Sequence, residues 1–350
     1  MELLEDAIDA VAHRTEFSGV VRVDRTGTVE IEKAYGFADR GHLIPNAVDT
    51  QFAIASGVKG LTALTVVSLI EDGSLTLETT ARSELGDDLP LIDDGVTIEH
   101  LLSHRSGIGD YLDEEAVNEI DYLMPVPVHE LESTEQYLAA LGGHDTVFAP
   151  GTRFAYCNGG FVVLALIAER ASGAPFHELV VRRVCEPAGM GDTDFLRSDE
   201  LPGRAALGYL TVDGPRTNVF HLPVRGGGDG GIYSTASDIS SLWTALFDGR
   251  IVSRDRVSEM VRPRSVDPRD SSRYGLGFWL HSSSDVVMLE GYDAGVSFRS
   301  AHDPVSRTTH TVISNTSEGA WPLTQLLDEL LGVVALERGD PDSELSSDRF

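Results

Sequence analysis

Basic residues and long apolar runs are scarce in this chain. Its 350 residues include 27 Lys and Arg against 56 Asp and Glu, which gives a formal net charge of −29. Such a chain repels nucleic acid phosphates and anionic lipid head groups, so we expect neither as a partner. No apolar run approaches the ~20 residues that a membrane-spanning helix needs, which predicts that the chain does not enter a membrane.

Cysteine is almost absent as well. The two cysteines, Cys157 and Cys185, are too few for a disulfide framework and too isolated for a zinc site, so we expect free buried thiols. The histidines are scattered and form no H-E-x-x-H pattern, and we predict neither a metal nor a cofactor. The first six residues, MELLED, lack the positive start and apolar core of a secretory signal, which predicts a cytoplasmic protein. The oligomeric state stays open.

The order of helix and strand patterns predicts the fold class. Residues 1–16 have the spacing of an amphipathic helix, 18–23 and 29–35 that of a β-hairpin, and 56–71 that of a helix apolar on most sides. From about 80 to 200 the pattern is mainly helical. Strand-like runs return at 208–212, 230–234, 274–281, 285–289, 296–301 and 308–314, with helices expected at 237–247 and 321–334.

We therefore predict an α/β (α+β) protein in which an antiparallel sheet is flanked by helices and interrupted by an all-α insertion. Residues 1–80 and 201–336 would form the sheet domain and 81–200 the mainly helical domain. Residues 337–350 are polar and predict a flexible tail. A cleft between the two domains is the expected place for a site.

A serine and a lysine stand three residues apart at the start of the predicted buried helix. Ser56 and Lys59 would share one helix face, and the helix N-terminus offers free N–H groups to a developing oxyanion. A serine at a helix start is usually only an N-cap. The lysine favours the catalytic interpretation, because Lys33 and Lys59 are the only lysines in the chain and an unused buried ammonium is costly.

A tyrosine and an asparagine precede the later helical segment at 159–171. Tyr156 becomes a useful base only beside positive charge, which Lys59 would supply across the cleft. The alternative is a packed loop tyrosine followed by Asn158 as a helix cap.

Together these residues resemble the serine β-lactamase and penicillin-binding protein superfamily, and most closely its class C and family VIII esterase branch. The order S-x-x-K at 56–59 and Y-x-N at 156–158 is similar to its first two motifs. Further similar stretches are LLSHRSG at 101–107, EPAGMGDT at 186–193, GGIYSTASD at 230–238 and YGLG at 274–277. The resemblance covers roughly residues 17–335 and implies the β-lactamase/transpeptidase-like fold.

The resemblance also implies roles for individual residues. Ser56 would be the acylated nucleophile, Lys59 its electrostatic and proton-transfer partner, and Tyr156 the base that also activates the deacylating water. Asn158 would hold a substrate carbonyl oxygen. His104, in the stretch after 101, would have a structural role in a turn.

The third motif of the family departs from the pattern. Its best match is residues 289–291, LEG, where Leu289 stands in place of the usual Lys, His or Trp. Gly291 still permits close backbone approach, and the N–H of Tyr292 would pair with that of Ser56 as oxyanion donors. Arg299 is a possible replacement cation, although we expect it at the surface.

The missing cation weakens the case for carboxylated substrates. We therefore predict a serine hydrolase that cleaves small neutral esters or amides through an acyl-Ser56 intermediate. One alternative is a β-lactamase or a D-amino-acid (D-Ala-D-Ala type) peptidase. A second is a protein that binds an acyl group without turnover.

Overall fold

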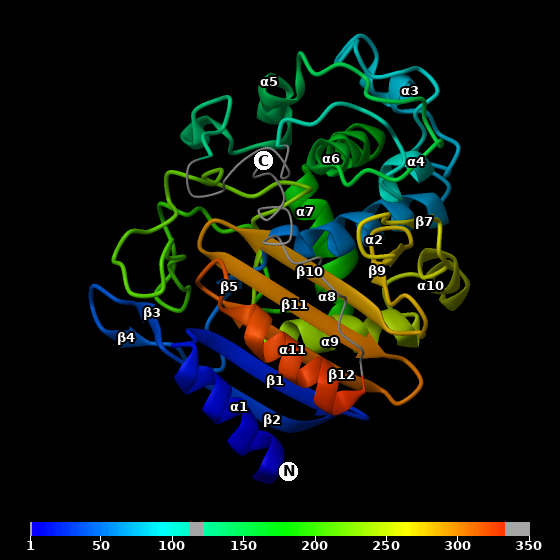
Figure 1. Cartoon of the computed structure of the whole chain (residues 1–350). Helices are drawn as coiled ribbons and strands as arrows, with labels where there is room; N and C mark the ends of the chain where they lie inside the picture. Colours follow the sequence, from blue (N-terminus) through cyan, green and yellow to red (C-terminus); the bar gives the residue numbers. More distant parts are fainter. Residues whose placement is uncertain (1, 113–121, 333–350) are drawn as a thin grey trace, which may run out of the picture.

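An eight-stranded antiparallel sheet forms the centre of the computed structural model, which describes residues 2–112 and 122–332 (Figure 1). Its strand order is β2-β1-β12-β11-β10-β9-β8-β7. The strands are β1 (Gly19–Arg25), β2 (Thr28–Tyr35), β7 (Ser265–Val266), β8 (Arg273–Tyr274), β9 (Trp279–Leu280), β10 (Val287–Asp293), β11 (Val296–Asp303) and β12 (Thr308–Ser314). Chain segments almost 300 residues apart are thus neighbours, since Gly19 of β1 pairs with Ser314 of β12.

Helices cover both faces of this sheet. The terminal helices α1 (Glu2–Arg14) and α11 (Ala320–Leu331) lie against one face, where Ile8, Val21, Val312 and Leu323 share an apolar cluster (Figure 1). Helix α9 (Ala236–Asp248) lies on the other face, next to α10 (Arg254–Met260). Because both faces are covered, β11 and β12 are buried along nearly their whole length.

The remaining helices come from the middle of the chain and enclose a second part of the core. Two of them, α2 (Val58–Glu71) and α6 (Asn158–Ser172), are buried and pack on each other. Around them lie η1 (Ala55–Gly57), α3 (Ala81–Leu85), α4 (Ile98–Leu102), η2 (Val128–Glu130), η3 (Thr134–Tyr137), α5 (Leu138–Leu141), α7 (Phe176–Val180), a π-helical turn η4 (Val181–Cys185) and α8 (Glu186–Ala188).

The predicted hairpin and most predicted helices are present, but three strand predictions need correction. Residues 208–212 form only isolated bridges through Tyr209. The run 230–234 shortens to β6 (Tyr233–Ser234), which pairs with β5 (Phe52–Ala53). The run 274–281 divides into β8 and β9, because Gly275 donates to the Phe278 carbonyl and Gly277 adopts φ 85° in the intervening turn.

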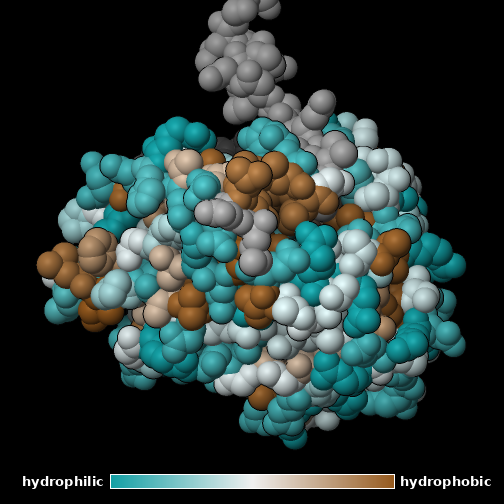
Figure 2. Space-filling view, turned by 90° about the horizontal axis from the view of Figure 1, so that it is seen from below, coloured by the Kyte–Doolittle hydropathy of each residue, from teal (hydrophilic) through white to brown (hydrophobic). Residues whose placement is uncertain are grey.

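The division into domains at 80 and 200 stays a prediction. In the described part of the chain, helices α3 to α8 all fall between 81 and 188, and no named strand lies there. The predicted tail, 337–350, lies outside the described residues. A small hairpin, β3 (Phe37–Asp39) and β4 (Ile44–Pro45), projects at one edge and exposes the apolar Phe37, Leu43 and Ile44. Figure 2 shows an apolar patch at that edge.

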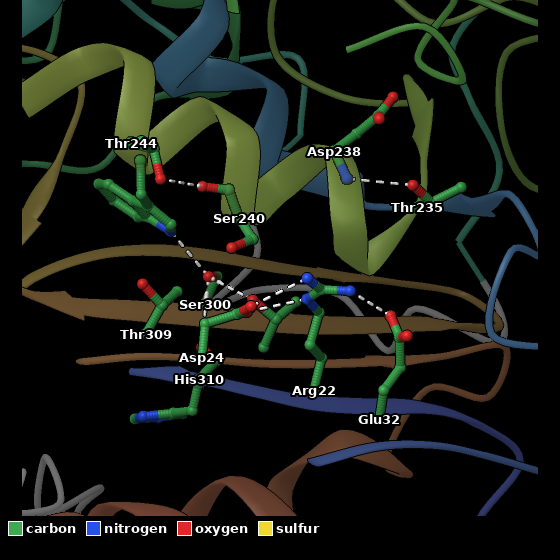
Figure 3. Close-up of polar contacts among 12 residues, drawn as sticks. Arg22, Asp24, Glu32, Thr235, Asp238, Ser240, Thr244, Ser300, Thr309 and His310 are labelled. Carbon is green, nitrogen blue, oxygen red and sulfur yellow. Dashed lines mark hydrogen bonds and ion pairs between the residues drawn. The ribbon is translucent and has the colours of Figure 1, made fainter. Parts of the chain in front are cut away.

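Buried polar contacts fix α9 on the sheet (Figure 3). Trp243 of α9 donates its indole N–H to the Ser300 hydroxyl on β11 at 2.8 Å. Nearby, the guanidinium of Arg22 on β1 lies between the carboxylates of Asp24 and Glu32. Paired in this way, the groups satisfy one another inside the protein.

No single described helix has both the length and the apolar composition to cross a membrane. One bent pair, α6 with the segment from α7 to α8, meets that test only when its two halves are combined. Both cysteines are free and buried, as predicted.

Candidate active site

The backbone turns sharply just before Ser56. Ala55 is fully buried and adopts φ 45°, a left-handed conformation that residues with a side chain rarely take. The turn η1 follows and leads into α2. Ser56 therefore lies in a 3₁₀ turn at the N-terminal end of α2, partly exposed, and does not act as the N-cap in the described contacts.

Lys59 is buried and directed at Ser56. Only 2% of its surface is exposed, and its Nζ lies 2.8 Å from Ser56 Oγ, 2.8 Å from Asn158 Oδ1 and 2.7 Å from the Asp229 carbonyl oxygen. Residues from three distant parts of the chain thus meet at one nitrogen. The predicted burial of this lysine is observed.

Tyr156 completes the cluster from the segment before α6. Lys59 Nζ lies 4.9 Å from the centroid of its ring. The ring contacts His104 at a centroid distance of 4.4 Å and stacks on Trp279 of β9 at 6.0 Å with an interplanar angle of 8°. Both contacts limit how the phenol can turn, so the ring is held beside the Ser56 and Lys59 pair.

His104 packs against the ring of Tyr156 and binds the backbone next to it. Its Nδ1 accepts a hydrogen bond from the Cys157 N–H at 3.1 Å, next to Tyr156. Burial lowers the pKa of His104 well below its usual value, and the charge of Lys59 acts in the same direction. The imidazole is therefore neutral, which agrees with the structural role predicted for it.

Gly291 brings strand β10 against the turn that holds Ser56. A Cβ added at Gly291 would lie 2.2 Å from the Ile54 carbonyl oxygen and 2.9 Å from the Ser56 nitrogen. Only glycine fits there. The next residue, Tyr292, lines the same pocket as Ser56 and Asn158. The backbone of β10 is thus close enough to Ser56 for a shared oxyanion site.

Three residues that sequence reasoning missed lie behind this cluster. Asp110 accepts hydrogen bonds from the N–H groups of Asn158 and Gly159 at 2.6 and 2.9 Å, so it pairs with the N–H groups that have no partner inside α6 at its N-terminal end. Burial raises the pKa of Asp110 to about 6, although these N–H groups oppose the shift. The hydroxyl of Tyr111 donates to the buried carboxylate of Asp229. Asp229 is the single acid in a glycine run, 225–231, and that contrast is the signal that could have drawn attention to it.

The third-motif position carries no cation. Leu289 is 2% exposed and packs over Gly60, where an added Cβ would lie 2.5 Å from its Cδ2. Arg299 is not at the surface, which corrects our expectation. It is 6% exposed and pairs with Glu290 and Asp328, on the side of the sheet that α11 covers. Strand β11 is buried on both faces, so the alternation of side chains along its sequence does not separate a buried face from an exposed one. This is why the sequence pattern predicts Arg299 at the surface.

The pocket beside Ser56 combines apolar walls with carboxylates. Leu112, Met124, Leu196 and Val224 line it, together with Asp229 and Asp293. Among the described residues no group of three or more His, Cys, Asp or Glu side chains could hold a metal ion. Beside this pocket, Ser56, Lys59 and Tyr156 bring a hydroxyl, an amine and a phenol together.

Comparison with known proteins shows the family of this chain. Residues 4–332 match the family model described as Beta-lactamase. The Bacillus subtilis protein PbpX, named as a penicillin-binding protein, is 30% identical over 81% of this chain and 67% of its own length. Esterase EstB of Burkholderia gladioli is 34% identical over 57% of this chain and 52% of its own. This chain thus spans about two thirds of the first relative and half of the second.

Solved structures give the same result. The penicillin-binding protein from Bacillus halodurans superposes with a TM-score of 0.86 at 35% identity, covering 92% of this chain and 99% of that one. The D-amino acid amidase from Ochrobactrum anthropi SV3 gives a TM-score of 0.77 at 25% identity, covering 94% and 98%. The predicted β-lactamase/transpeptidase-like fold and the prediction of a serine hydrolase related to esterases and amidases are confirmed, without a specific substrate. The chain belongs to the Beta-lactamase family.

Proposed function

We propose that the protein hydrolyses small neutral esters or amides through an acyl-Ser56 intermediate. The observation that carries this proposal is the meeting of Ser56 Oγ and Asn158 Oδ1 at the Nζ of Lys59, each 2.8 Å away, beside the ring of Tyr156. Acyl transfer to a serine needs a hydroxyl nucleophile and an adjacent base, and the amine and the phenol are the groups beside Ser56 that can share this work.

Each residue has one task in the proposed reaction. Ser56 Oγ attacks the substrate carbonyl carbon while its proton passes to the oxygen of Tyr156. The oxyanion that forms accepts hydrogen bonds from the N–H groups of Ser56 and Tyr292. When the tetrahedral intermediate collapses, the bond to the leaving group breaks and Tyr156 returns the proton to that group.

Deacylation repeats these steps with water as the nucleophile. Tyr156 takes a proton from the water, the acyl bond to Ser56 breaks, and Ser56 Oγ recovers the proton. Lys59 supplies positive charge beside the phenol of Tyr156. A nearby cation favours the phenolate form, so this charge makes Tyr156 a better proton acceptor. Asn158 binds Lys59 in the described structure, and we propose that its amide also contacts the substrate carbonyl.

The third-motif position determines our choice of substrate class. Leu289 has an uncharged side chain that is buried in the core, so this position offers neither a charge nor a contact to a substrate carboxylate. Arg299 is occupied by acidic partners away from the pocket. Esters and neutral amides therefore fit better than β-lactams or D-Ala-D-Ala peptides.

An amide of a D-amino acid is the second candidate. Asp293 lines the pocket next to Tyr292, and its carboxylate would accept the ammonium group of such a substrate. The similarity to the D-amino acid amidase supports this reading.

Hydrolysis of a p-nitrophenyl ester tests the proposal. We expect release of p-nitrophenol by the wild type, loss of that activity in Ser56→Ala, and no loss in Ser258→Ala, which removes an exposed serine of α10. Equal turnover by Ser56→Ala and the wild type would reject the proposal. A stable acyl adduct without turnover would instead support a binding protein. A panel of neutral amides, D-amino-acid amides and a chromogenic cephalosporin would then rank the substrate classes.

A further inference from the structure

The glycine-rich loop that carries Asp229 is fixed against α2. The Thr62 hydroxyl donates to the Gly228 carbonyl at 2.6 Å, and Lys59 Nζ donates to the Asp229 carbonyl at 2.7 Å. Within the loop, the Gly227 N–H donates to the Gly230 carbonyl at 2.9 Å. A Cβ at Gly228 would lie 2.3 Å from the Phe161 carbonyl oxygen, so the loop also packs tightly on α6. Asp229 therefore has little freedom to move.

The Asp229 carboxylate lies inside the protein beside the Ser56 and Lys59 pair. Asp229 is 7% exposed, and its Oδ2 accepts a hydrogen bond from the Tyr111 hydroxyl. Burial raises the pKa of Asp229 above its ordinary value, and the charge of Lys59 and the hydrogen bond from Tyr111 oppose part of that shift. These two contacts therefore offset part of the cost of burying a charged carboxylate.

The oxygens around Lys59 leave its protonation state open. The Asn158 and Asp229 carbonyl oxygens can only accept a hydrogen bond, whereas the Ser56 hydroxyl can accept or donate. An ammonium would donate to Ser56, and a neutral amine would accept the serine proton. Burial of Lys59 favours the neutral amine, and a neighbouring negative charge favours the ammonium. The local charges therefore decide between the two.

We propose that Asp229 is a positioning residue that keeps Lys59 charged in the resting enzyme. The carboxylate belongs to the residue whose carbonyl oxygen touches Nζ, so it is the negative charge that this rigid loop brings to Lys59. This inference rests on the proposed function: a charged Lys59 cannot take the Ser56 proton, which leaves that task to Tyr156 and makes Lys59 its electrostatic partner.

Other titratable groups also face Lys59 and Asp229, and their charges affect the protonation state of Lys59. His104 is neutral, and Tyr137 has its pKa raised well above the usual value by burial and by the charges of Asp229 and Asp293. Asp110 adds a carboxyl whose pKa is about 6. Among the described residues, the titratable groups that face Lys59 or Asp229 from the neighbouring elements are His104, Asp110, Tyr111, Tyr122, Tyr137, Tyr156, Cys157 and Asp293.

The scarcity of lysine makes a direct measurement possible. With isotope-labelled lysine, NMR at Cε gives one signal for Lys33 and one for Lys59, and Lys33→Arg assigns them. In Asp229→Asn we expect the titration midpoint of Lys59 to fall by about 1 to 3 pH units relative to the wild type, because the nearby opposite charge is gone. Asp238→Asn is the matched control, since Asp238 is equally buried but bonds to Thr193. It should leave the Lys59 midpoint unchanged.

A Lys59 midpoint that is the same in Asp229→Asn and the wild type overturns the inference. The titration does not depend on turnover, so this result is distinct from failure of the proposed function, which Ser56→Ala tests. The pH profile of kcat/KM gives a second readout: its alkaline limb should move to lower pH together with the Lys59 midpoint.

Tyr111→Phe keeps the inference testable if Asp229→Asn does not fold. The wild-type Lys59 signal should show a small acid inflection as Asp229 protonates. Without the Tyr111 hydroxyl that carboxylate is less stabilised, and the inflection should move to higher pH. A Lys59 signal with no acid inflection, or with one that does not move in this variant, contradicts the assignment of Asp229.

Discussion

Replacing Gly291 by alanine would separate strand β10 from the turn that holds Ser56. The added Cβ would meet three backbone atoms, at 2.2 Å for the Ile54 oxygen, 2.9 Å for the Ser56 nitrogen and 3.0 Å for the Gly57 nitrogen. Ordinary contact begins at 3.4 Å, and backbone cannot rotate away as a side chain can. The strand and the turn must therefore move apart by more than 1 Å. A displacement of about 1 Å between reacting groups is enough to reduce the rate of a reaction that depends on their positions.

The consequence should be a loss of catalysis with the fold retained. The N–H groups of Ser56 and Tyr292 flank this contact, and loss of one oxyanion donor costs about 10²–10³ in kcat, or about 3–4 kcal/mol. We expect kcat for a p-nitrophenyl ester to fall about 100-fold or more in Gly291→Ala, with a smaller change in KM. Gly203→Ala is the control, because nothing lies within 4 Å of a Cβ at Gly203. A folded Gly291→Ala protein with kcat near the wild-type value would refute the oxyanion geometry.

Three further predictions address the groups around the site. Arg299→Met should lower the free energy of unfolding by about 3 kcal/mol in urea titrations, because the buried carboxylate of Asp328 loses the guanidinium and keeps only the His310 imidazole as an ion-pair partner. Ester turnover under conditions where the variant is folded should persist, and lost turnover in the folded variant would indicate that Arg299 acts on the substrate. Leu289→Ala should cost about 2–4 kcal/mol of stability through the cavity it leaves, and an unchanged unfolding midpoint would show that Leu289 is not part of the core. His177 has its pKa lowered from 6.5 to about 4 by burial, so its neutral form stabilises the fold above pH 6.5, and that contribution disappears as the pH falls toward 4. In His177→Gln the unfolding free energy should therefore decline less steeply between pH 6.5 and 4 than in the wild type, and parallel declines would contradict the assignment.

The sequence predicts the chemical residues of the site better than the groups that support them. Ser56, Lys59, Tyr156 and Asn158 form recognisable spacings, and the structure brings these four together. Asp110 and Asp229 stand in loops that reach the site only when the chain is folded. A single acidic residue in a loop follows no helix or strand periodicity, so the sequence pattern does not indicate that it lies at the site.

The fold shows the same contrast between local and long-range information. The hairpin of β1 and β2 depends on residues that are close in the sequence and on a short turn, so the sequence pattern is sufficient to predict it. Residues 208–212 look like a strand but find no continuous partner, and only the tertiary structure decides that. The burial of Arg299 likewise depends on α11, which arrives from the end of the described chain.

In the proposed reaction Ser56 carries the acyl group during turnover. Acid quenching of the protein during hydrolysis of a p-nitrophenyl ester, followed by peptide mass spectrometry, would locate that group. We predict the mass of the acyl group on the peptide that contains Ser56, together with a burst of p-nitrophenol equal to the enzyme concentration. An acyl group found on another residue, or a burst that persists in Ser56→Ala, would show that Ser56 is not the nucleophile.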